Sequence, residues 1–342
     1  MNNVTHGLLE VLNPGLGNGI QDDGRLGYRH MGITVSGSLD PLLAHCANAL
    51  VGNGNEAACI EIRVLGPVLR IKHGPVRVAI AGHMTPKVRR ADGRQEAVPA
   101  WASVTLEPGD ELETGTVKGG IAYLAVSGGI ATPPQLGSRS TYQRALIGGL
   151  GGRLLAKGDL IPGGALADRQ QGERTAPSWT YADAPVRVML GPQDGHFTPE
   201  AVQDFLGTDY TVTPQTDRMG MRLEGQALTH RTPACADIVS DGVTPGAIQV
   251  PGNGQPIILL ADCQTVGGYP KIATVISADL PRLAQLKPGQ TLRFCAVGAG
   301  EAKAALIERE ARWRAWRDGI QTVAPATAAT TDDDEDFYCA AV

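Results

Sequence analysis

The sequence predicts a mainly β protein with a few short helices. Glycine and proline account for 44 and 23 of the 342 residues, which is typical of a chain that turns often. Short runs that are apolar or alternate in polarity recur, and most of them stop at glycine, proline or an acid-glycine pair. Long helical periodicities are few. Together these observations favour closed or sandwiched sheets.

The strands are expected where those runs occur. The expected ranges are 68–74, 76–82, 103–112, 120–129, 186–191, 247–251, 256–262 and 290–297. A Pro-Gly or Lys-Gly turn recurs at 106–112, 156–162 and 286–294, where a type II turn or a bulged hairpin needs a residue at positive φ. This repetition is typical of duplicated β-barrel units.

Three helices are expected among the strands. The first begins at the capping Asp40 and ends at Gly52, and the second begins at the capping Thr198 and ends at Gly207. The third covers 301–319 and is charged around most of its circumference, so we expect it to lie across the surface. Its expected apolar anchors are Leu306, Trp313 and Trp316.

The strands fall into two groups, which predicts two domains. We expect a first β domain at 1–165, a polar linker at 166–184, and a second β domain at 185–298. The surface helix then occupies 299–320, and 321–342 has the small and acidic composition of a disordered tail.

Composition excludes several classes of function. The chain is 42% apolar with a net charge of −5, which gives no electrostatic bias towards nucleic acid. No run approaches about 18 apolar residues, the length that favours a membrane helix, and no secretory signal is recognised at the N-terminus. The six cysteines form no CxxC pair and the seven histidines no HxxxH or HxH pair, so no metal site is expected. A reducing cytoplasm is the expected location.

Familiar catalytic motifs are missing as well. The sequence has no G-x-x-x-x-G-K-[ST] phosphate loop and no G-x-S-x-G elbow. Any catalysis must therefore use carboxylates, amides, hydroxyls and arginines.

Two clusters of such residues lie in the expected first domain. Gln21 and Arg25 precede Asp40 in a polar stretch, where the arginine could bind a carboxylate in a bidentate manner. A loop salt bridge with a helix cap explains the same residues. The glycine-rich stretch 138–159 carries Arg139, Arg144 and Arg153, which could bind an anion; a flexible hairpin is the alternative.

Two further clusters lie in the expected second domain. Asp217 and Arg218 form either part of a site or a structural ion pair. After the strand 256–262, alternation would put Asp262 and Gln264 on one side, beside a glycine pair and in the same layer as Gln249. A carboxylate next to amide donors could accept a proton there. A buried polar network that holds a turn is the alternative.

Several motifs occur in an order that resembles a known family. These are SRSTY followed by GGLGGRLLAKGD, then TDRMGMRLEG, then GAIQVPGNGQPIILLADCQTVGGYP. The chain resembles the KipA family, also known as the biotin-dependent carboxyltransferase family, allophanate hydrolase subunit 2 or the C subunit of bacterial 5-oxoprolinase. It is also similar to the second half of the carboxyltransferase domain of urea carboxylase. The family's TTGGY and SGA[LM]D motifs differ here at Val266 and Ser38.

The resemblance implies a fold, partners and an activity. It implies tandem cyclophilin-like β-barrel domains that pair with a KipI-like subunit, with the active site where the two subunits meet. A third, LamB/YcsF-like subunit would join them, and the complex would open the lactam of 5-oxoproline to glutamate at the expense of ATP. One alternative is carboxyl transfer from carboxybiotin to urea or a related amide. Another is a non-catalytic partner that regulates a KipI-like kinase inhibitor.

The resemblance also suggests roles for particular residues. The chain has no AMKM biotin motif and no ATP-grasp region, so we expect no covalent cofactor, with ATP or carboxybiotin held partly by partners. Arg218 or Arg25 would hold a carboxylate or phosphate, and Asp262 would accept or relay a proton. Donors from Gln249, Gln264 or the glycine backbone would polarise the carbonyl of a small amide or lactam. The expected catalytic residues are Asp262, Gln264, Arg218 and Gln249. The expected substrate-binding residues are Gln21, Arg25, Asp40, Arg153, Asp217, Gly267, Gly268 and Tyr269.

Overall fold

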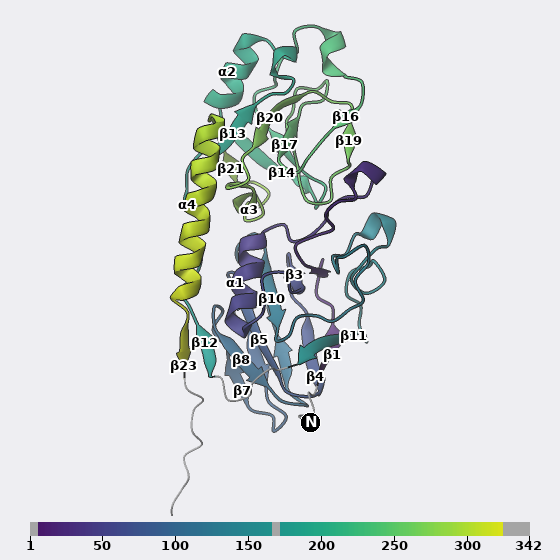
Figure 1. Ribbon diagram of the computed structural model, residues 1–342, viewed down its shortest axis with the longest axis vertical. Helices are drawn as coiled ribbons and strands as arrows, with labels where there is room; N and C mark the ends of the chain where they lie inside the picture. The colour runs from purple at the N-terminus through teal and green to yellow at the C-terminus, as the bar shows by residue number, and fades with distance from the viewer. Residues whose placement is uncertain (1–5, 166–171, 324–342) are drawn as a thin grey trace, which may run out of the picture.

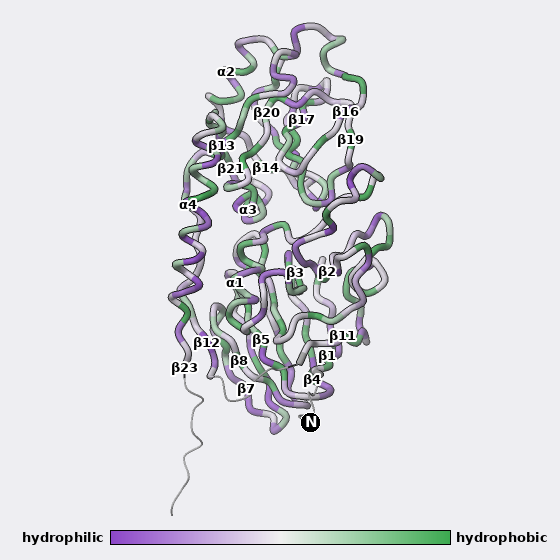
Figure 2. Tube along the Cα trace, viewed as in Figure 1, coloured by the Kyte–Doolittle hydropathy of each residue, from purple (hydrophilic) through white to green (hydrophobic). Residues whose placement is uncertain are grey.

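The computed structural model describes residues 6–165 and 172–323, and its fold is mainly β (Figure 1). Two β domains follow one another along the long axis of the molecule, and the long helix α4 (Ala299–Asp318) runs beside both. Hydrophobic segments gather inside the two domains, whereas α4 is largely white and purple in Figure 2. The predicted fold class is therefore confirmed.

The first domain packs two antiparallel sheets around one apolar core. The larger sheet has the order β11-β1-β4-β9-β6-β7, with β11 Leu160–Ala165, β1 His6–Asn13, β4 Val68–His73, β9 Glu111–Glu113, β6 Lys87–Arg89 and β7 Gln95–Ala97. The smaller sheet has the order β2-β3-β10-β5-β8, with β2 Gly19–Gln21, β3 Cys59–Ile62, β10 Ala122–Val126, β5 Val76–Ala81 and β8 Ser103–Leu106. All residues of β3, β5 and β10 are buried, because helix α1 covers the second face of this sheet.

Helix α1 (Pro41–Val51) has the ends that the sequence predicts. The carboxylate of Asp40 accepts a hydrogen bond from Leu43 N at 3.1 Å, and Pro41 occupies the first turn. Gly52 closes the helix at φ 85°, a left-handed conformation that favours glycine.

The second domain is built on one eight-stranded sheet. Its order is β21-β14-β15-β18-β17-β20-β13-β22, with β21 Thr291–Leu292, β14 Tyr210–Thr216, β15 Gly220–Glu224, β18 Ile257–Leu259, β17 Ala247–Gln249, β20 Lys271–Val275, β13 Val186–Leu190 and β22 Phe294–Ala296. Only Arg293 separates β21 from β22, so the two edges of the sheet meet and the barrel is nearly closed. The remaining elements here are α2 Pro199–Gly207, α3 Leu280–Leu283, and the ribbon of β16 Asp241–Gly242 with β19 Val266–Gly267.

Single-turn 3-10 helices lie in the connecting loops. They are η1 Arg29–Met31, η2 Gln143–Ala145, η3 Asp194–His196 and η4 Pro233–Ala236.

Part of the predicted linker belongs to the first domain. Strand β12 (Glu173–Thr175) pairs with β23 (Gln321–Val323), which directly follows α4. Trp179 is 4% exposed and packs under α4, where the Arg312 guanidinium lies 4.3 Å from its ring centre. The segment 166–184 was predicted to be poor in strands, and β12 is its one strand among the described residues; the prediction of disorder from 321 onwards is wrong for β23. Residues 324–342 of the predicted tail lie outside the described residues.

Several of the expected strands are shorter than predicted or are divided. The run 103–112 is divided into β8 and β9 by a turn, and the run 256–262 is a strand only as far as Leu259. The third helix begins and ends within two residues of its expected bounds, and its Trp313 is buried as predicted, at 6% exposure.

Candidate functional site

A cleft lies between the two domains, and three adjoining cavities form it. Their volumes are about 570, 490 and 100 Å³, and all three have Asp217 in their walls. We refer to the largest as the apolar arm, lined by Leu39, Ile121, Met221 and Leu286 among others. We refer to the second as the polar arm, lined by Arg222, Gln249, Gln264 and Tyr269 among others. The smallest, the junction, has Arg144, Arg218 and Asp262 in its walls.

Two side-chain amides form the floor of the polar arm. Gln249 is the last residue of β17 and is 2% exposed, and its Oε1 accepts a hydrogen bond from Nε2 of Gln264 at 3.3 Å. Its own Nε2 donates to the carbonyl of Tyr269 at 3.3 Å. Each amide nitrogen carries a second N–H that no described residue accepts. The arm therefore offers two amide donors to a ligand.

Gly267 lets the backbone pass close to these amides. A Cβ at this position would lie 2.6 Å from Nε2 of Gln249 and 3.2 Å from Nε2 of Gln264. Both contacts are shorter than a carbon and an amide nitrogen tolerate, so a side chain here would displace the amides.

Arg218 links the two domains at the junction. Its Nε and Nη2 donate to the carboxylate of Asp262 at 2.9 and 3.0 Å. Its Nη1 donates to Oε1 of Glu61 in the first domain at 2.6 Å, and Nη2 also donates to the carbonyl of Gly37 at 2.6 Å. The guanidinium thus bridges two carboxylates from different domains.

Glu61 is the most enclosed member of this network. Its Oε2 accepts hydrogen bonds from the Tyr123 hydroxyl at 2.7 Å and from Leu39 N at 2.9 Å. Burial raises the pKa of this carboxyl, but the charge of Arg218 and the two hydrogen bonds outweigh burial and leave the pKa below its usual value. Glu61 is therefore ionised at neutral pH.

The loop that carries Arg144 is fixed to the segment 21–25. Asp22 accepts a hydrogen bond from the Ser138 hydroxyl at 2.6 Å, and its other oxygen accepts one from Arg139 N at 2.6 Å. Arg25 is fully buried and donates to the carbonyl of Ser140 at 2.7 Å. These contacts hold η2 against the cleft, where Arg144 lines both the polar arm and the junction.

Comparison with known protein families gives one decisive match. The family model of the carboxyltransferase domain, subdomain A and B, matches residues 31–296. The chain belongs to this carboxyltransferase family.

Similar proteins include two curated bacterial subunits. The 5-oxoprolinase C subunit of Escherichia coli is 35% identical over 315 residues, which cover 91% of this chain and 98% of that protein. The same protein of Haemophilus influenzae is 35% identical over 286 residues, which cover 83% of this chain and 89% of that protein.

Similar solved structures come from larger enzymes. The urea amidolyase of Kluyveromyces lactis matches with a TM-score of 0.81 and 26% identity, over 92% of this chain and 21% of that chain. The urea carboxylase of the same organism matches with a TM-score of 0.80 and 26% identity, over 92% of this chain and 30% of that chain. This carboxyltransferase chain thus corresponds to a fraction of those enzymes.

The cleft of this carboxyltransferase chain brings together several predicted residues. Gln249, Gln264 and Tyr269 line the polar arm, and Arg218 and Asp262 line the junction. Asp217 borders every cavity of the cleft, where its Oδ1 accepts from Met219 N at 2.7 Å. Gly267 lies beside the amides, whereas the predicted Gly268 faces the Ile238 carbonyl and the Ser240 hydroxyl instead.

Asp262 and Gln264 do not converge as the alternation argument predicts. The strand β18 ends at Leu259, so Asp262 falls in a turn and side-chain alternation no longer applies. Asp262 points to Arg218, whereas Gln264 contacts Gln249. Both carboxylate oxygens of Asp262 accept hydrogen bonds from the guanidinium of Arg218. Asp262 therefore has a structural role, which argues against its expected role as the proton acceptor. The guanidinium of Arg218 is equally committed, which argues against its expected role as an anion ligand.

The remaining predicted ligands lie away from the cavities. Asp40 is fully buried and accepts hydrogen bonds from the Tyr181 hydroxyl at 2.7 and 2.8 Å and from Gln285 at 2.8 Å. Arg153 forms a bidentate ion pair with Asp159, with both contacts at 2.7 Å. Gln21 donates to a backbone carbonyl at 3.1 Å and, like Arg25, holds a loop. The structural alternatives therefore explain Gln21, Arg25, Asp40 and Arg153 better than substrate binding does.

Three arginines in the cleft have no partner among the described residues, and of these only Arg144 was predicted to bind an anion. The guanidiniums of Arg63, Arg144 and Arg222 make no hydrogen bond or ion pair with any described residue, although all three residues line the cavities. Arg144 and Arg222 stand in motifs that the sequence analysis singled out, but only the fold shows that they lack a partner. Nothing in the sequence marks Arg63.

The described residues contain neither a metal-binding cluster nor a membrane-spanning helix. Within residues 6–165 and 172–323, no three side chains of His, Cys, Asp and Glu gather in a way that could hold a metal ion. No helix in the same part of the chain is long and apolar enough to cross a membrane.

Proposed function

We propose that the chain is the C subunit of a 5-oxoprolinase-type complex, which opens the lactam of 5-oxoproline to glutamate at the expense of ATP. The observation that carries this proposal is the extent of the match. The chain corresponds to 98% of the Escherichia coli protein, but to 19% of the urea amidolyase of Lachancea kluyveri. A match over nearly the whole of the first protein and only a small part of the second supports the first activity.

The polar arm suits a lactam that bears a carboxylate. Arg144 and Arg222 supply guanidiniums without partners among the described residues, and a guanidinium binds a carboxylate through two parallel hydrogen bonds. The second N–H groups of Gln249 and Gln264 can donate to the lactam carbonyl, where negative charge develops during ring opening. In this proposal the chain binds and orients the substrate and polarises its carbonyl.

Partner subunits would complete the site. Two exposed apolar side chains lie near the polar arm in the sequence. Leu146 is two residues after Arg144 and is 68% exposed, and Val266 is two residues after Gln264 and is 55% exposed. Exposed apolar side chains of this kind are typical of an interaction surface. A KipI-like and a LamB/YcsF-like subunit are the proposed partners. No cofactor is attached to this chain in the proposal, and ATP is bound through the partners.

Carboxyl transfer from carboxybiotin to urea or a related amide is the second candidate. The TM-scores of 0.81 and 0.80 with urea amidolyase and urea carboxylase favour it. The guanidiniums of Arg144 and Arg222 fit the carboxylate of carboxybiotin as well as that of 5-oxoproline. The chain spans only 21% and 30% of those two enzymes, which makes this candidate the weaker one.

Co-expression with the two partner subunits tests the proposal. We expect the purified complex to release glutamate from 5-oxoproline and to hydrolyse ATP in proportion, with no effect of avidin. Gln249→Met should lower turnover, while Gln255→Met, which changes an amide that contacts only Gly225, should not. Carboxylation of urea without glutamate release would favour the second candidate. A complex in which Gln249→Met leaves turnover unchanged would instead fit a subunit that only regulates its partner.

A further inference from the structure

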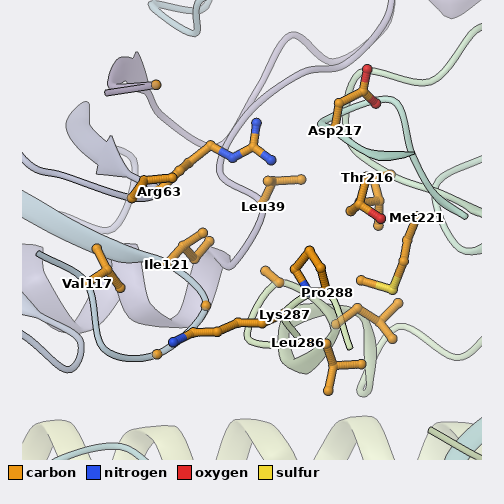
Figure 3. A pocket seen from close by; sticks show the side chains of 17 residues that line it. Leu39, Arg63, Val117, Ile121, Thr216, Asp217, Met221, Leu286, Lys287 and Pro288 are labelled. Carbon is orange, nitrogen blue, oxygen red and sulfur yellow. The ribbon is translucent and has the colours of Figure 1, made fainter. Parts of the chain in front are cut away.

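The apolar arm is not used by the proposed reaction. Its volume of about 570 Å³ lies within the range of about 300–1,000 Å³ that drug-sized ligands occupy. Its walls combine Leu39, Val117 and Ile121 of the first domain with Met221 and Leu286 of the second, as Figure 3 shows. A lactam of one small ring that binds in the polar arm would leave this space empty.

Arg63 is one of the charged residues in this wall. Figure 3 shows its side chain reaching from the first domain towards the middle of the cavity. The residue is half-buried, and its guanidinium has no hydrogen bond or ion pair with any described residue. A guanidinium in an apolar wall is costly unless an anion joins it.

The neighbouring carboxylates make no direct ion pair with Arg63. Glu61 acts on it only at a distance, because its two oxygens are taken up by Arg218, Tyr123 and Leu39 N. The Oδ1 of Asp217 accepts from the amides of Met219 and Gly220.

Lys287 supplies a second positive charge to the cavity wall. Its Nζ donates to the carbonyl of Lys118, a contact that leaves the charge itself without a carboxylate partner. The arm thus carries two cations, Arg63 and Lys287, against the one carboxylate of Asp217, so it attracts an anion, and the rest of its lining is predominantly apolar.

We propose that the apolar arm binds a small molecule that has an apolar body and a single anionic head, a carboxylate or a sulfonate. The head pairs with Arg63 while the body lies against the apolar side chains of both domains. This ligand is separate from the substrate of the polar arm, and the inference does not depend on the proposed reaction. Because both domains contact the ligand, its binding also stabilises their relative orientation.

A matched pair of fluorescent probes tests this proposal with the full chain. Anilinonaphthalene sulfonate has an apolar body with one sulfonate, and phenylnaphthylamine is the same body without it. We expect saturable binding of the sulfonate with one site per chain. Arg63→Gln should weaken it about tenfold, the loss expected for one charge-assisted contact, and should leave phenylnaphthylamine unaffected. Arg314→Gln, which changes an exposed arginine of α4 that has no partner among the described residues, is the control and should change neither probe.

A second variant tests the role of charge while keeping Arg63 in place. Val64 is 50% exposed and lines the same arm, so Val64→Asp should fold normally and add a negative charge beside Arg63. We expect it to weaken the sulfonate but not the neutral probe. Binding of the sulfonate at several equal sites, or equal affinity in the parent chain and both variants, would overturn the proposal.

Discussion

The guanidinium of Arg218 lies 2.6 Å from the carboxylate of Glu61, and the two residues belong to different domains. Asp262 holds the other edge of the guanidinium at 2.9 Å. All three side chains are nearly buried, with exposures of 11, 2 and 10% for Arg218, Glu61 and Asp262. Burial lowers the pKa of Arg218, but the two carboxylates outweigh burial and raise it above the ordinary value. The network therefore stays charged and fixes the walls of the cleft.

Removal of Arg218 should destabilise the chain strongly. Arg218→Met leaves two buried carboxylates without their cation, which costs about 3–5 kcal/mol in comparable buried pairs. The free energy of unfolding from urea titration measures this loss. Arg222→Met, which changes an exposed arginine of the same strand region, should cost less than about 0.5 kcal/mol. Equal stabilities of the two variants would show that the network does not hold the domains together.

Asp40 should make the chain less stable as the pH rises from about 4 to about 6. Burial raises the pKa of this carboxyl to about 6 from an ordinary value of 3.8, although hydrogen bonds from Tyr181, Leu43 N and Gln285 oppose the shift. In that window the unfolded chain releases the proton and the folded chain keeps it, so unfolding becomes easier by on the order of 3 kcal/mol.

Asp40→Asn isolates this effect. Asparagine caps a helix about as well as aspartate and does not titrate. We expect the stability difference between the parent chain and the variant, measured by urea titration at several pH values, to change between about pH 4 and 6 and to be constant above. The pH dependence of stability that Glu61 contributes has the opposite sign. The pKa of this carboxyl is lowered in the folded chain, so its stabilising effect is present above about pH 4.5 and is lost in stronger acid. A constant difference across the window would contradict the prediction.

The parts of the fold that depend on neighbouring residues could be predicted from the sequence. Helix α1 follows from a cap, a proline and a terminal glycine within one short stretch, and the strands follow from apolar runs that end at turns. The pairing of β12 with β23 could not be predicted, because neither short polar strand carries an apolar pattern and their partners are far apart in the chain.

The site also has features that the local sequence predicts and features that depend on residues far apart in the chain. The contact of Gln249 with Gln264 agrees with their expected place in one layer. The partner of Arg218 across the cleft, Glu61, is 157 residues away and depends on how the domains are oriented. Arg63, Arg144 and Arg222 stand out only because no described residue pairs with them, and a sequence does not reveal a missing partner.

A methyl group at Gly267 should impair turnover without unfolding the chain. The Cβ of Gly267→Ala would lie 2.6 Å from Nε2 of Gln249 and so would shift the amide donors of the polar arm. Misplacement of this size costs about 10- to 100-fold in kcat/KM. The measurement is glutamate release by the co-expressed complex.

Gly268→Ala is the matched control for that variant. The nearest atom to its Cβ is the carbonyl oxygen of Ile238 at 3.3 Å, and neither amide is close, so we expect at most a small loss. If both alanine variants turn over at the parent rate, the amides do not act on the substrate.

Arg144 and Arg222 should determine the affinity for the carboxylate of the substrate. Both guanidiniums line the polar arm without a partner among the described residues, so Arg144→Gln and Arg222→Gln remove a charge without breaking a structural contact. Each should raise KM for 5-oxoproline about tenfold, because one charge-assisted contact is worth about 1.5–3 kcal/mol in full and less at an exposed site. Pyrrolidinone, the same lactam without the carboxylate, serves as the comparison substrate in the same complex. Its weak turnover should not differ between the parent and the variants, since it has no group for either arginine to bind. An equal loss with both lactams would mean that the arginines support the loop or the partner contact, and unchanged KM values would place the carboxylate elsewhere in the complex.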